Sequence, residues 1–138
     1  MMMVRSYLAA SSIEGLGVHA VEAIRKGQLV WRFEPEFDTS FFLEDVARTP
    51  RHFQEFIERY TYPHPTDRDR VVLDCDEGRF MNHSEDPSID MSDPLRGIAR
   101  RDIAAGEEIT CDYRQFEVTP EAFQPSRHKV GMQYILAA

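Results

Sequence analysis

The stretch Gly106-Glu-Glu-Ile-Thr-Cys-Asp-Tyr113 starts with a turn glycine and continues into a run that contains β-branched residues. Glycine accepts positive φ angles without steric cost, and β-branched side chains favour strands. The pattern therefore predicts a turn followed by a strand that ends at Asp112 and Tyr113. A tyrosine at a strand end most often packs against a core or its rim. Its phenol, with an ordinary pKa of about 10, is mainly a hydrogen-bonding group at neutral pH.

A second copy of this pattern lies near the start of the chain. Ala20–Val30 and Ala99–Ile109 share alanine, isoleucine, glycine and a β-branched residue at the same offsets. Each copy predicts a strand, a turn that needs glycine, and a second strand. Two copies are too few for a solenoid, so we expect the two units to pack on each other in a compact β domain.

The rest of the chain predicts a short helical segment among further strands and loops. Apolar side chains recur at helical spacing within residues 50–60, at Phe53, Phe56, Ile57 and Tyr60. Residues 43–47 favour a shorter helix just before them. Strands and tight turns are expected over residues 4–37, 71–75 and 97–113, and loops over residues 62–70 and 80–94.

Composition is that of an ordinary globular protein. The chain has 138 residues, 42% apolar and 29% charged, which fits one domain and disfavours disorder, collagen and coiled coils. It has 16 basic and 24 acidic residues, a net charge of −8, so it is a poor general nucleic-acid binder. This charge suits a basic or neutral partner, or serves only solubility.

Targeting and metal signals are weak. The sequence holds no apolar run of membrane-spanning length, and residues 1–10 make a poor signal peptide, so we expect no membrane partner and a cytoplasmic location. Cys75 and Cys111 are the two cysteines and form no C-x-x-C pair, so we expect no metal site and no disulfide framework.

Two further stretches carry side chains suited to chemistry. Arg79-Phe-Met-Asn-His-Ser84 puts an amide, an imidazole and a hydroxyl on consecutive residues. Asn82 offers both donor and acceptor groups, and His83 can act as a base or simply hold a turn. Gly15-Leu-Gly17 lacks the third glycine of a dinucleotide fingerprint and permits a close approach of the backbone to a ligand or a strand.

Together these three stretches resemble the SET domain, in the same order and at the same distances along the chain. The resemblance covers residues 4–116, and the chain is similar to stand-alone, bacterial-type SET proteins. Residues 117–138 would be a tail after the domain. It implies a mainly β fold, a β-clip of small sheets with a short helical insert and a pseudoknot near the C-terminus. It also implies a protein-lysine N-methyltransferase that uses S-adenosylmethionine.

The resemblance also implies roles for individual residues. The main chain of Gly15, Leu16 and Gly17 would approach the methionine part of the cofactor. Asn82 and His83 would bind its ammonium end and its adenine. Tyr113 would be the catalytic residue and would line a channel to the cofactor, orienting the lysine amine rather than acting as general base, because its ordinary pKa is too high for that role.

Two more positions belong to the expected cofactor site. Arg79, in the same block as Asn82, is expected to brace the crossing strands. Many relatives have a Cys-rich segment after the domain that closes the channel, and this chain lacks one. Phe116 or Phe123 would cover the adenine of the cofactor and the lysine instead. Ser88 stands where the family often has asparagine, at a position that looks tolerant.

Several alternatives stay open at this stage. The family's second channel tyrosine corresponds to Tyr60 or Tyr62, and neither lies in a clear motif. The chain is an enzyme acting on a lysine-containing, basic protein or peptide, or an inactive SET-like module that binds cofactor or a partner. A β-clip binding domain of another kind is the third possibility. A homodimer or a partner can complete so small a site.

Overall fold

The computed structural model describes residues 1–116, so the expected tail over residues 117–138, including Phe123, lies outside the described residues. The elements follow in the order β1 (Ser6–Ala10), β2 (Leu16–Ala20), β3 (Leu29–Arg32), β4 (Thr39–Phe42), α1 (Leu43–Val46), α2 (Arg51–Tyr60), β5 (Thr61–Pro63), β6 (Arg70–Leu73), η1 (Glu77–Phe80), β7 (Asn82–His83), β8 (Ile89–Asp90), β9 (Arg96–Ala99), β10 (Glu108–Cys111) and η2 (Tyr113–Gln115). The mainly β fold with a short helical insert is confirmed.

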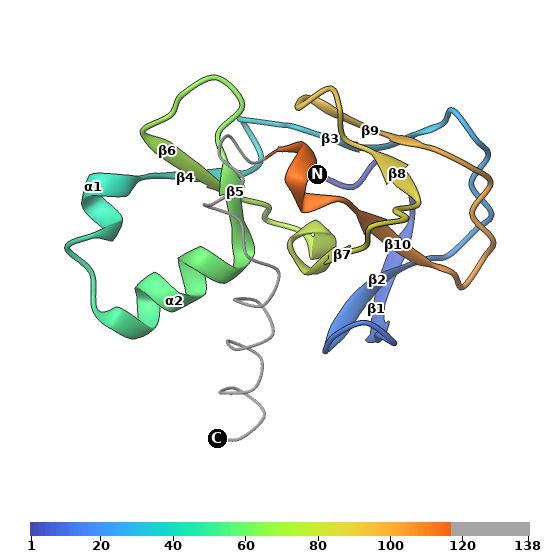
Figure 1. Ribbon diagram of the computed structural model, residues 1–138, viewed down its shortest axis with the longest axis horizontal. Coiled ribbons are helices and arrows are strands. Elements are labelled where there is room, and N and C mark those ends of the chain that lie inside the picture. The colour runs from blue at the N-terminus through green and yellow to red at the C-terminus, as the bar shows by residue number, and fades with distance from the viewer. Residues whose placement is uncertain (117–138) are drawn as a thin grey trace.

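The strands form small sheets, and the helices α1 and α2 lie at one end of the molecule. The strand orders are β1-β2-β10-β7, β3-β9-β8 and β4-β6-β5. In Figure 1, α1 and α2 lie with the β4-β6-β5 sheet, opposite the end that carries β1 and β2. β7 and β10 run parallel and pair Asn82 with Thr110. The pseudoknot itself stays a prediction.

The two repeated units pack on each other, as their shared pattern predicts. Ile24 and Ile103 form an antiparallel bridge in which each N–H donates to the other's carbonyl over 2.8 Å. Gly27 donates to the Ala99 carbonyl, and Gly106 donates to the Ala20 carbonyl. In each unit, the N–H of the turn glycine therefore bonds the alanine at the end of the other unit's first strand. These units supply much of the buried core, including Ala20, Ile24, Val30, Ala99, Ile103 and Ile109.

Both turn glycines adopt the left-handed conformation that their positions in the pattern predict. The φ angles are 88° at Gly27 and 84° at Gly106. A methyl group at Gly27 would meet nothing within 4 Å, and one at Gly106 would come no closer than 3.8 Å to the Tyr7 hydroxyl. Any penalty of a side chain here therefore comes from the backbone and not from crowding.

We expect Gly106→Ala to lower the free energy of unfolding by about 1–2 kcal/mol, the penalty of a left-handed L-residue. Urea unfolding of the variant beside the parent measures it. Gly106→Asn is the control, because asparagine tolerates this conformation better and should lose less. Equal stability of the parent and the alanine variant would contradict a strained turn.

Helix α2 confirms the expected helix and its apolar face. It begins after Pro50, buries Ile57 and places Phe56 between Phe53 and Tyr60, with ring centroids 6.4 and 4.9 Å away. α1 confirms the shorter helix. Within residues 1–116, no helix is long and apolar enough to cross a membrane.

Two expected loops contain short strands. The expected loop over residues 62–70 begins inside β5, which pairs with β6. β5 is an edge strand, and an edge strand tolerates Pro63, which has no N–H to donate to a neighbouring strand. The expected loop over residues 80–94 contains β7 and β8, whose partners β10 and β9 lie further along the chain. Strands of two residues leave no local periodicity to read.

Candidate functional site

The glycine stretch and the Asn82 side chain are brought together by direct hydrogen bonds. The Asn82 amide nitrogen donates to the carbonyls of Glu14 and Leu16 over 3.0 and 3.1 Å. Gly15, between these carbonyls, has a φ of 50°. Asn82 therefore fixes the backbone of the stretch that was expected to approach a ligand. Its amide serves the chain itself in this structure.

Glu108 is a site residue that the sequence reasoning missed. Its carboxylate accepts from the Asn82 amide over 3.0 Å and from the Ser11 hydroxyl over 2.7 Å. A Cβ at Gly17 would lie only 2.6 Å from the Glu108 carboxyl carbon. Gly17 thus makes room for this carboxylate, so its lack of a side chain has a use within the fold. Its signal in the sequence is its place as the second glutamate of Gly106-Glu-Glu.

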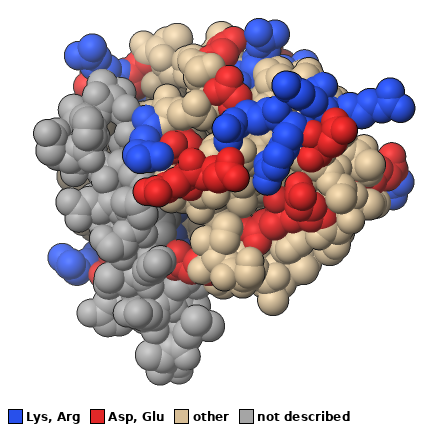
Figure 2. Space-filling view, turned by 45° about the vertical axis from the view of Figure 1, so that its right-hand side comes forward, with Lys and Arg blue, Asp and Glu red and all other residues tan. Residues whose placement is uncertain are grey.

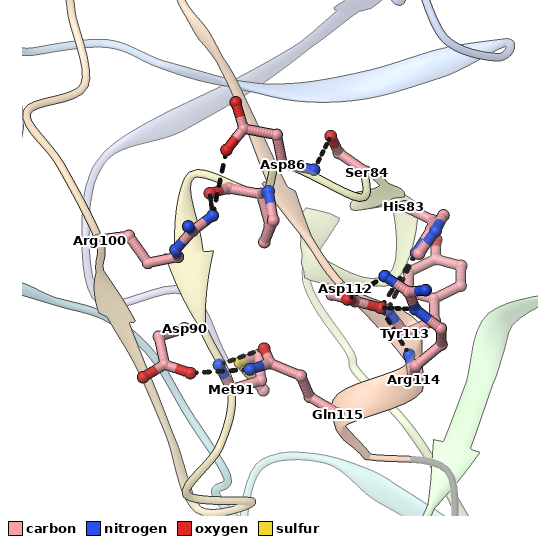
Figure 3. Close-up of polar contacts among 11 residues, drawn as sticks. His83, Ser84, Asp86, Asp90, Met91, Arg100, Asp112, Tyr113, Arg114 and Gln115 are labelled. Atoms are coloured by element: carbon pink, nitrogen blue, oxygen red, sulfur yellow. Dashed lines mark hydrogen bonds and ion pairs between the residues drawn. The ribbon is translucent and has the colours of Figure 1, made fainter. Parts of the chain in front are cut away.

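Tyr113 is held at both ends by the block that contains Asn82. Its main-chain N–H donates to His83 Nδ1 over 3.1 Å, and its hydroxyl donates to the Met81 carbonyl. Its ring centroid lies 5.3 Å from that of His83 and 5.7 Å from that of Phe116. Figure 3 shows Tyr113 beside His83 at the start of η2. Burial raises the pKa of the Tyr113 phenol well above its ordinary value, so the phenol is neutral and serves as a hydrogen-bonding group.

The His83 imidazole is neutral as well, because of its contact with Tyr113. Its Nδ1 accepts the Tyr113 N–H, so that nitrogen carries no proton. Burial lowers the pKa of His83, although the Asp112 carboxylate, 3.7 Å from Nδ1, acts in the opposite direction. Asp112 in turn is bound by the Arg114 guanidinium over 2.8 Å (Figure 3). The imidazole therefore works here as a support for the Tyr113 backbone.

Phe116 joins Tyr113 to one of the two candidate channel tyrosines. Its ring lies 6.1 Å from that of Tyr62, whose hydroxyl donates to Asp74 over 3.1 Å. Asp74 also accepts from the Trp31 indole over 2.8 Å, and burial raises its pKa to about 6. The Tyr62 hydroxyl is therefore committed to Asp74, while its ring reaches toward Tyr113 through Phe116.

The other candidate, Tyr60, lies at the end of α2 and packs on Phe80 of the block that contains Asn82. Its ring centroid is 5.4 Å from that of Phe80, the residue before Met81. Both tyrosines thus border the site, and the choice of a second channel tyrosine stays open between them. Arg79 has an exposed side chain that lies over the Phe80 ring, 5.2 Å from its centroid. That contact is with its own neighbour and does not connect two strands.

Ser88 is tied to β10 by buried hydrogen bonds to Thr110. Its hydroxyl donates to the Thr110 carbonyl over 3.3 Å and accepts the Thr110 N–H over 2.8 Å. The Ser88 N–H donates to the Thr110 hydroxyl over 3.0 Å. This buried set ties the loop after His83 to β10. Gln115 of η2 adds a second tie: its side-chain oxygen accepts the Met91 N–H, and its side-chain nitrogen donates to Asp90 at the end of β8 (Figure 3).

Arg59 of α2 is the second site residue that the sequence reasoning missed. Its side chain is only 9% exposed, and Nη2 lies 4.0 Å from the Glu14 carboxylate. Its guanidinium carbon lies 5.1 Å from the centroid of the Tyr60 ring. Its positive charge also acts on the Tyr113 phenol, although burial of that phenol has the larger effect on its pKa. A cation therefore lies where the glycine stretch and Tyr113 meet.

Comparison with known proteins identifies the family. Residues 15–114 match the SET domain, so the chain belongs to the SET-domain family. It is 30% identical over 134 residues to human histone-lysine N-methyltransferase 2D, covering 90% of this chain and 2% of that protein. It is 31% identical over 126 residues to histone-lysine N-methyltransferase trr of Drosophila melanogaster, covering 84% and 5%. The chain thus spans a small part of these relatives' length.

Solved structures show the same fold. One is a humanized mutant of the Chaetomium thermophilum Polycomb Repressive Complex 2, with a TM-score of 0.60 and 20% identity over 84% of this chain and 16% of that one. Another is an active polycomb repressive complex 2 in the basal state, with a TM-score of 0.58 and 22% identity over 80% of this chain and 15% of that one. At these identities the likeness concerns the fold alone.

Proposed function

We propose that this chain transfers a methyl group from S-adenosylmethionine to the side-chain amine of a lysine in a protein. One observation carries the proposal: the buried, neutral Tyr113 phenol is tied by its hydroxyl and its main chain to the block of Asn82 and His83. That block is tied in turn to the glycine stretch. The three motifs of the family thus form one connected set.

The residues present fit the cofactor. Its methionine part carries an ammonium group, and the half-buried carboxylates of Glu14 and Glu108 lie along the glycine stretch that would receive it. The main chain of Gly15, Leu16 and Gly17, together with Asn82, His83 and Phe116, would hold the rest. When bound, the sulfonium of the cofactor supplies the methyl group.

Tyr113 would act by position and not by proton abstraction. Transfer is an in-line displacement, in which a fixed near-attack geometry supplies several kcal/mol, up to about 7–11 in well-oriented systems. The lysine amine must lose a proton first, and a dry channel lowers its pKa. The neutral phenol gives its one proton to the Met81 carbonyl, so its oxygen can accept an N–H of the amine and in this way orient the amine lone pair. The rings of Tyr62, Phe116 and Tyr113 can exclude water.

The names of the relatives and the charge of the chain both favour a basic protein substrate. The relatives are histone-lysine N-methyltransferases, and this chain has a net charge of −8. On the face drawn in Figure 2, acidic side chains lie among arginine and lysine side chains and not in one patch. We therefore propose a diffuse attraction for a lysine-rich segment. The cytoplasmic location and the homodimer stay predictions.

Isothermal titration with S-adenosylmethionine and with S-adenosylhomocysteine tests the cofactor directly. We expect saturable one-to-one binding of both. A transfer assay with radiolabelled cofactor and unfractionated core histones then tests turnover. Binding without transfer to any basic protein would favour an inactive module, and no binding up to millimolar ligand would favour a β-clip domain of another kind.

A further inference from the structure

Arg59 carries a buried charge with an unfilled hydrogen-bonding position. Its Nη1 is buried and has no hydrogen-bond partner among residues 1–116. Its Nη2 lies 4.0 Å from the Glu14 carboxylate, which is beyond hydrogen-bond length. The side chain is nine-tenths buried, with 9% of its surface exposed. This state is costly, because the N–H groups of Nη1 have left water without gaining an acceptor.

The place of this cation defines what it can bind. Glu14 precedes Gly15, and its carbonyl accepts the Asn82 amide. The Arg59 charge also reaches the buried Tyr113 phenol. The guanidinium therefore lies beside the glycine stretch, on the side of the proposed methyl-transfer site. Arg59 reaches this point from α2, which contributes no motif to the site.

We propose that Arg59 binds the α-carboxylate of the cofactor's methionine part, an inference that rests on the proposed function. Guanidinium presents a planar fork of N–H donors that matches a carboxylate. An α-amino acid group carries one negative and one positive charge close together. Arg59 and Glu14, 4.0 Å apart, offer the opposite pair of charges at a similar spacing. The carboxylate would fill the position that Nη1 leaves open.

The test compares two proteins with two ligands, so that the loss of the Arg59 side chain and the loss of the ligand carboxylate are measured separately and together. Titration calorimetry compares the parent and Arg59→Gln with S-adenosylmethionine and with its decarboxylated analogue, which keeps the amine, sulfonium and adenosine. We expect the variant to bind S-adenosylmethionine about 10- to 100-fold more weakly, the range for a hydrogen bond to a charged group. We expect its affinity for the decarboxylated analogue to change by less than about threefold.

Two further variants separate recognition from folding. Arg51→Gln removes a cation from the same helix at an exposed position, where the side chain is 89% exposed, and should change neither affinity. Arg59→Lys keeps the charge without the fork and should restore part of the lost affinity. Thermal unfolding of each variant shows whether it retains the fold.

The outcomes divide cleanly. A loss confined to the ligand that carries the carboxylate supports the assignment. An equal loss for both ligands would mean that Arg59 supports the glycine stretch and recognises no carboxylate, which overturns the inference. Unchanged binding of both ligands overturns it as well. If the parent binds neither ligand, the proposed function fails together with the inference, and that result is distinct from the other three.

Discussion

Tyr113→Phe should nearly abolish methyl transfer while leaving the affinity for S-adenosylmethionine within a few fold of the parent. The substitution keeps the ring that packs on His83 and Phe116 and removes only the hydroxyl. Positioned hydrogen-bonding groups of this kind are worth roughly 100-fold or more in rate. The measurement is the rate of label transfer at saturating cofactor, together with calorimetric binding.

The same variant should also be less stable than the parent. The Met81 carbonyl loses its partner, the Tyr113 hydroxyl, in a buried place. An acceptor left unsatisfied in this way costs about 1–3 kcal/mol of unfolding free energy. The assay temperature must therefore lie below the melting transition of the variant. Tyr7→Phe, at an exposed position on β1, is the matched control. A parental rate in Tyr113→Phe would remove the hydroxyl from the proposed mechanism.

Asn82→Ala should weaken binding of S-adenosylmethionine by about tenfold or more, the value of one or two hydrogen bonds to charged or buried groups. Its amide holds the carbonyls of Glu14 and Leu16 and contacts Glu108. Without it, the cofactor must order the glycine stretch on binding. His83→Ala should weaken binding too, because the imidazole belongs to the same proposed cofactor site and supports Tyr113.

Calorimetric titration of Asn82→Ala beside Ser84→Ala measures this effect. Ser84 belongs to the same block, but its hydroxyl accepts the nearby N–H of Asp86, two residues along the chain. The serine variant should therefore bind nearly as the parent does. If Asn82→Ala and His83→Ala both take up the cofactor as tightly as the parent, this strand does not form the cofactor site.

The sequence predicted the parts of the fold whose signals are local. The glycine at a fixed offset from alanine and isoleucine predicted both turns, and Gly27 and Gly106 have the expected φ angles. The period of apolar residues predicted α2. The short strands β5, β7 and β8 escaped, because each depends on a partner strand elsewhere in the chain and not on its own residues.

In the candidate site too, the sequence predicted the residues of local motifs and missed the contacts between distant parts of the chain. The motifs predicted Gly15, Gly17, Asn82, His83 and Tyr113. In the structure Asn82 bonds the carbonyls of Glu14 and Leu16, on either side of Gly15, and His83 accepts the Tyr113 N–H. Glu108 was visible in a motif, yet its contact with Asn82 spans 26 positions and its fit against Gly17 needs the pairing of β10 with β2. The sequence therefore showed Glu108 within a motif but did not predict its contacts with Asn82 and Gly17.

What the sequence determined by itself is the family, the turns and the residues of three motifs, because these are patterns of neighbours along the chain. Only the tertiary structure decided the direction of side chains: Asn82 onto the glycine stretch, Tyr62 onto Asp74, and Arg59 into a buried place beside Glu14. Arg59 in the sequence is one polar residue on a helix. Its significance comes from burial, which removes water and leaves a charge that needs an acceptor.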